Sequence, residues 1–124
     1  MKAKKPSSLA TSGFSPVDAL ESPRLLGASF RPPETWRAWR IVLRAFDGLP
    51  ITEPADVELF RRCTGRAEPP TAPGAELWIA AGRRSGKSRI AALLAVHAAA
   101  FTDWKAKTAP GELAVIAVLA ADRA

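Results

Sequence analysis

The residue types that could do chemistry are concentrated in one stretch of eight: Ala81, Gly82, Arg83, Arg84, Ser85, Gly86, Lys87 and Ser88. A small residue, four intervening residues and then Gly-Lys-Ser is the pattern of a P-loop, whose backbone N–H groups bind phosphate oxygens. Gly82 and Gly86 lack a β-carbon, which permits tight turns and close approach of the backbone to a ligand. Lys87 would reach the β- and γ-phosphates, and the Ser88 hydroxyl would bind Mg²⁺. The stretch therefore predicts a site for ATP and magnesium.

Two arginines lie inside this loop, where most P-loops carry smaller or apolar residues. Arg83 could fold back toward the γ-phosphate and stabilise the charge of the transition state, as an arginine finger does. Arg84 is interpreted as a solvated side chain. The competing interpretation of the whole stretch is an ordinary strand-to-helix turn with a basic loop.

The segments around the loop have the lengths that a P-loop needs. Leu77-Trp78-Ile79-Ala80 is an apolar run typical of a buried strand, and Ser88 to Phe101 is predicted to be a helix that is apolar nearly all round. A second apolar run, Leu113 to Leu119, follows a Pro-Gly loop. The predicted fold class is therefore α/β: a partial P-loop NTPase domain of strand, loop, helix and strand over residues 76–124.

Three segments precede this core. Residues 1–33 carry lysines, serines and prolines without periodicity, which predicts a flexible basic arm. Residues 34–65 are predicted to be helical: the first helix places Trp36, Trp39, Leu43 and Phe46 on one face. The second helix is expected from Pro54 to about Cys63, with Gly65 ending it. Residues 66–75 are rich in proline and are interpreted as a linker.

Composition limits the remaining possibilities. At 124 residues the chain is one domain or less, and its formal charge of +6 suits a polyanionic partner such as nucleic acid, or serves only solubility. Cys63 is the single cysteine, so an internal disulfide or a multi-cysteine metal site is excluded. No signal-peptide core follows the first lysines, and the run from Ile90 to Phe101 is too short to span a bilayer. We expect a soluble cytoplasmic protein without membrane contact.

With these motifs the sequence resembles the large terminase subunit of tailed bacteriophages, the ATPase that packages DNA into capsids. The resemblance is most specific in the loop that directly follows Glu76-Leu77-Trp78. It extends upstream through the helix with Trp36 and Trp39. The other matching residues are Phe60 to Arg66 with Pro69-Pro70, Ala91-Ala92, Gly111-Glu112 and Ala121-Asp122-Arg123.

The resemblance implies roles for particular residues. Lys87 would hold phosphates, Ser88 would hold magnesium, and Arg83 would match an arginine proposed to act as a finger in cis. The helix around Trp36 would lie where these ATPases contact adenine, although a tryptophan stripe at helical spacing is more often part of a core. The implied partners are double-stranded DNA, the small terminase subunit and the portal, in the cytoplasm of a bacterial host.

The sequence also departs from the family, because it ends two residues after Asp122. We expect the acidic strand and the nuclease domain of these ATPases to be missing, so that the fragment alone would bind ATP but hydrolyse it poorly. Two unpaired apolar strands would also leave the isolated chain marginally stable or prone to associate. Two alternatives stay open: a truncated helicase-like P-loop ATPase, and a non-enzymatic prophage remnant or basic binding protein with a vestigial P-loop.

Overall fold

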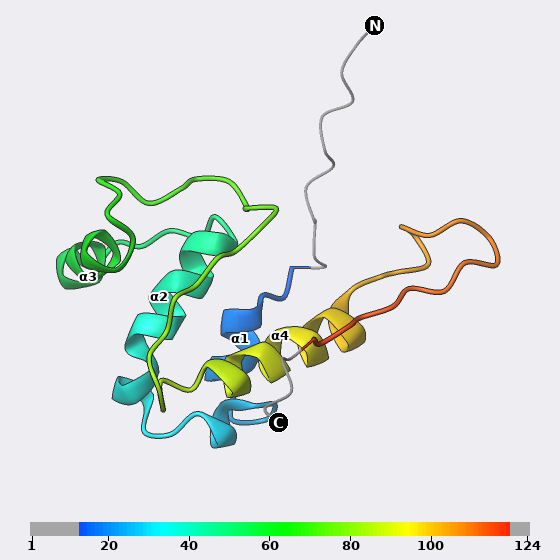
Figure 1. Cartoon of the computed structure of the whole chain (residues 1–124), viewed down its shortest axis with the longest axis horizontal. Coiled ribbons are helices and arrows are strands. Elements are labelled where there is room, and N and C mark those ends of the chain that lie inside the picture. The colour runs from blue at the N-terminus through cyan, green and yellow to red at the C-terminus, as the bar shows by residue number, and fades with distance from the viewer. Residues whose placement is uncertain (1–12, 120–124) are drawn as a thin grey trace, which may run out of the picture.

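The computed structural model describes residues 13–119, and these form a small helical assembly (Figure 1). The helices in chain order are α1 (Pro16–Glu21), η1 (Gly27–Ser29), η2 (Pro33–Trp36), α2 (Arg37–Phe46), α3 (Pro54–Thr64) and α4 (Lys87–Phe101), where η marks a 3₁₀ helix. Helix α1 packs on both α2 and α4, and α3 packs on α2.

The predicted α/β fold is wrong: within residues 13–119 the structure is helical and contains no strand. The two expected strands, Leu77 to Ala80 and Leu113 to Leu119, run without regular structure (Figure 1). A strand exists only where a neighbour shares its backbone hydrogen bonds, and neither segment has one. The side chains of Trp78 and Leu113 are accordingly 88% and 89% exposed. An apolar run forms a buried strand only when a neighbouring strand is present to pair with it.

The main core lies where α1, the η2–α2 segment and α4 meet. Its buried apolar side chains are Val17, Ala19, Leu20, Phe30, Trp36, Leu43, Ile90 and Leu93. A second, smaller cluster of Ile41, Ala45 and Phe60 joins α2 to α3. Helix α4 has apolar residues on nearly all sides, yet it buries few of them, because no sheet covers its outer face. None of the helices between residues 13 and 119 combines the length and apolar character needed to cross a membrane.

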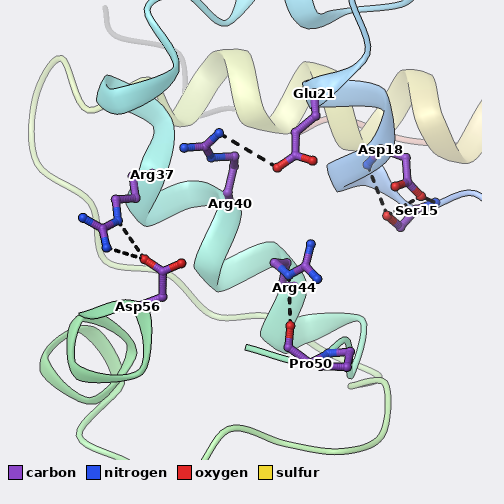
Figure 2. Close-up of polar contacts among 8 residues, drawn as sticks. All are labelled: Ser15, Asp18, Glu21, Arg37, Arg40, Arg44, Pro50 and Asp56. Carbon is purple, nitrogen blue, oxygen red and sulfur yellow. Dashed lines mark hydrogen bonds and ion pairs between the residues drawn. The ribbon is translucent and has the colours of Figure 1, made fainter. Parts of the chain in front are cut away.

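Helix α1 lies inside the segment that composition assigned to a flexible arm. It begins with a capping box: the Asp18 N–H donates to Ser15 Oγ over 3.2 Å, and the Ser15 N–H donates to Asp18 Oδ2 over 2.7 Å (Figure 2). Val17 and Leu20 on this helix are buried in the core. Residues 13–33 are thus part of the packed structure, and residues 1–12 of the predicted arm lie outside the described residues.

The two helices predicted within residues 34–65 are confirmed, with a difference at the start of the first, whereas the second begins at Pro54 as predicted. The aromatic segment opens with η2 before α2 begins, and α3 starts at Pro54, which fits the first turn because its missing N–H would have no partner there. Gly65 ends α3 with a left-handed φ of 69°, and its N–H donates to the Arg61 carbonyl. Glycine tolerates this conformation without a steric penalty.

The basic face of α2, formed by Arg37, Arg40 and Arg44, connects this helix to its neighbours (Figure 2). Arg37 forms an ion pair with Asp56 on α3 and donates a 2.7 Å hydrogen bond to it. Arg40 forms a 3.9 Å ion pair with Glu21 of α1. Arg44 donates a 3.1 Å hydrogen bond to the Pro50 carbonyl. These arginines therefore help to hold α2 against α1, α3 and the intervening loop.

Candidate functional site

The eight-residue loop leads directly into the N-terminus of α4. The backbone enters the left-handed region twice, at Arg84 (φ 59°) and at Gly86 (φ 84°), and helix α4 begins at Lys87. The N–H groups of the first helical turn have no intrahelical acceptor, and no side chain caps them. These amides and the helix dipole together favour an anion at this end of α4.

Two tryptophans from the aromatic segment hold the loop in place. The Trp36 ring, only 7% exposed, lies so close to Gly86 that a β-carbon there would sit 2.5 Å from it. The ring also meets Phe30 edge to face, with centroids 4.8 Å apart. Trp39 donates a 2.7 Å hydrogen bond from Nε1 to the Ser85 carbonyl. The loop conformation is therefore tied to the core on two sides.

An open hollow of about 650 Å³ lies over the loop and the start of α4. It is lined by Thr35, Trp36, Arg84, Ser85, Gly86, Lys87, Ser88 and Arg89. Three of these residues are cationic and none is a carboxylate, so the hollow attracts anions. Lys87 Nζ donates to the Gly82 carbonyl over 3.3 Å and so folds back across the loop. The Arg89 guanidinium is engaged elsewhere, with the Ser29 carbonyl and the Trp36 ring.

Two residues that line the hollow have a buried polar atom without a hydrogen-bond partner among the described residues: the indole N–H of Trp36 and the hydroxyl of Ser85. The hydroxyl oxygen of Ser85 is buried and makes no hydrogen bond to any described residue. A buried polar group without a partner costs about 1–3 kcal/mol. A phosphate oxygen in the hollow would be an acceptor for this hydroxyl, which makes the site compatible with the phosphates of a nucleotide.

The structure brings together most, but not all, of the residues that the sequence nominated. Arg84 to Ser88 line the hollow, and Gly82 contributes the carbonyl that Lys87 contacts. Ala81 and Arg83 are not among the lining residues. Arg84, which was interpreted as a solvated side chain, lines the hollow, whereas Arg83, the candidate arginine finger, does not. Arg89 and Thr35 were missed, although Arg89 directly follows the motif.

The residues that line the hollow provide groups for binding phosphate, and none of them is a carboxylate or a histidine. Ser88 is exposed at the hollow, where its hydroxyl is free to serve as a magnesium ligand. No group of three or more His, Cys, Asp or Glu side chains that could hold a metal occurs in residues 13–119. Asp122 and Arg123 lie outside this part of the chain. Comparison with known protein families, with curated proteins and with solved structures found no match to this chain.

Proposed function

We propose that the loop of residues 81–88 binds ATP with Mg²⁺, and that the chain is the ATP-binding N-terminal part of a terminase-like DNA-packaging ATPase. The observation that carries the proposal is the convergence, at one open hollow, of uncapped helix amides, basic side chains and the unpartnered Ser85 hydroxyl. Each of these groups stabilises an anion, and all except those of Arg89 come from the segment with the P-loop pattern.

Binding of the phosphates would rearrange one contact. Lys87 now donates to a neutral carbonyl, that of Gly82. Phosphate would replace this contact with a charge-assisted hydrogen bond, which is roughly twice as strong. The amides of the first turn of α4 and the Ser85 hydroxyl would donate to other phosphate oxygens. Magnesium bound at Ser88 would neutralise part of the phosphate charge.

The resemblance to large terminase subunits supplies the wider context of the proposal. In that context the partners are double-stranded DNA, the small subunit and the portal, and the positive net charge of the chain suits contact with DNA. A helicase-like ATPase and a vestigial loop are the competing functions. Reading the coding DNA beyond the codon for Ala124 distinguishes them: an acidic strand followed by a nuclease carboxylate cluster supports the terminase assignment, and a stop codon supports a remnant.

The binding proposal is tested by titrating the chain with Mg-ATP and measuring the dissociation constant by calorimetry. Lys87→Ala should weaken binding by about tenfold or more, because a charge-assisted hydrogen bond is lost. Lys105→Ala is the matched control, since it removes the same charge from an exposed position away from the hollow. Equal affinities of the two variants, or no binding by the wild-type chain, would contradict the proposal.

A further inference from the structure

A second cavity, of about 530 Å³, lies away from the loop, between the start of α1, the end of α2 and the C-terminal half of α4. It shares no lining residue with the hollow over the loop. Most of its wall is apolar, and its aromatic and aliphatic members include Phe14, Phe46, Leu77, Leu94 and Trp104. A space of this size, largely apolar and with few polar groups, is typical of sites for small organic molecules.

The polar groups of this cavity are acidic rather than basic overall. Asp47 and Asp18 line it together with His97. One carboxylate oxygen of Asp47, Oδ2, is buried and has no hydrogen-bond partner among the described residues. Asp18, in contrast, already accepts hydrogen bonds at the α1 capping box. Asp47 Oδ2 is thus a hydrogen-bond acceptor without a donor, in a wall that is mostly apolar.

The contact of His97 determines which ring nitrogen carries a proton. His97 Nε2 lies 2.8 Å from the Phe14 carbonyl oxygen, and the side chain is 4% exposed. A carbonyl can only accept a hydrogen bond, so Nε2 must bear the hydrogen. The Nε2–H of His97 therefore donates to the Phe14 carbonyl and is not a hydrogen-bond donor to Asp47.

We infer that this cavity binds a small organic amine, with its ammonium group donating to Asp47 and its apolar body against the aromatic wall. The ligand supplies the hydrogen-bond donor that Asp47 lacks. The cavity is lined by two carboxylates, Asp47 and Asp18, and one histidine, His97, and this excess of acidic groups favours a cationic ligand. The aromatic wall is suited to the same charge, because a cation is attracted to the face of an aromatic ring. Lys107 already shows this preference, with Nζ 5.6 Å from the centroid of the Trp104 ring. This site is independent of the proposed ATP site.

The test is a ligand-observed NMR titration with 2-phenylethylamine, compared with the neutral alcohol 2-phenylethanol. We expect the amine to bind at least about tenfold more tightly, because only the amine forms a charge-assisted hydrogen bond with Asp47. Asp47→Asn should remove this preference. Glu58→Gln should retain it, because it neutralises a carboxylate on the exposed side of α3, outside the cavity.

A second variant tests the location of the ligand without changing charge. Ala98 lines the cavity, and Ala98→Leu should weaken amine binding by filling the space. Circular dichroism serves as the control that each variant keeps its helices. Equal binding of the amine and the alcohol by the wild type, or unchanged amine binding by both Asp47→Asn and Ala98→Leu, would overturn the inference.

Discussion

Replacing Gly86 by alanine should destabilise the chain through two separate effects at the loop. Gly86 has a φ of 84°, a conformation in which a β-carbon is strained. The added β-carbon would also sit 2.5 Å from two atoms of the Trp36 ring. This ring is buried and packed against Phe30, so it cannot swing away freely. Two other glycines allow the two effects to be measured separately.

Gly65 has a similar φ of 69°, but a β-carbon there meets nothing within 4 Å. Gly65→Ala therefore reports the conformational cost alone, about 1–2 kcal/mol. Gly82 has neither a positive φ nor a neighbour within 4 Å, so Gly82→Ala should cost little. Gly86→Ala adds overpacking against Trp36, about 1–3 kcal/mol more, for a total of about 2–5 kcal/mol.

The assay is urea unfolding of the three variants and the wild type, followed by far-UV circular dichroism. Similar m-values across the set would show that the midpoints report stability. The expected order of destabilisation is Gly86→Ala, then Gly65→Ala, then Gly82→Ala. If Gly86→Ala were no more destabilising than Gly65→Ala, the packing of Trp36 beneath the loop would be refuted.

Three further outcomes follow from particular contacts. Burial raises the pKa of Asp47, with Asp18 acting in the same direction and His97 opposing it. A raised folded-state pKa means that stability is greatest below the ordinary aspartate value and falls as pH rises through the folded value. Asp47→Asn should remove that fall, and a pH-independent stability difference from wild type between pH 3 and 7 would contradict this. Trp39→Phe should cost about 0.5–1.5 kcal/mol through the lost hydrogen bond to Ser85, and should also weaken Mg-ATP binding; thermal unfolding and calorimetry measure both. A double-mutant cycle on Arg37 and Asp56 should give a coupling of about 0.2–1 kcal/mol because the pair is partly exposed, and a coupling near zero would mean that α3 is held by its apolar contacts alone.

Local signals in the sequence predicted local structure well. The spacing of Trp36 and Trp39, the proline at position 54 and the glycine at position 65 identified α2 and α3, because these features act within one helix. The helix after the loop was also predicted within one residue of its observed start, Lys87. The capping box of α1 was overlooked, although Ser15 followed by Asp18 is its sequence signature.

The sheet could not be judged from the same kind of signal. An apolar run such as Leu113 to Leu119 shows which side chains would be buried in a sheet, but not whether a neighbouring strand exists. The contact of Trp36 with Gly86 was likewise beyond sequence reasoning, since it joins residues 50 positions apart through tertiary packing. The eight-residue motif predicted the lining of the hollow only in part: Arg84 lines it and Arg83 does not, and residue type alone cannot distinguish two neighbouring arginines.

The most direct test of the central claim is a ¹⁵N–¹H correlation spectrum recorded during titration with Mg-ATP, and then with Mg-ADP and adenosine. Phosphate binding at the start of α4 predicts that the amides of residues 82–89 and the indole N–H of Trp39 shift, with affinity falling as phosphates are removed. Adenosine should leave these signals unchanged. Equal shifts with adenosine, or shifts confined to other parts of the chain, would contradict a phosphate-binding loop.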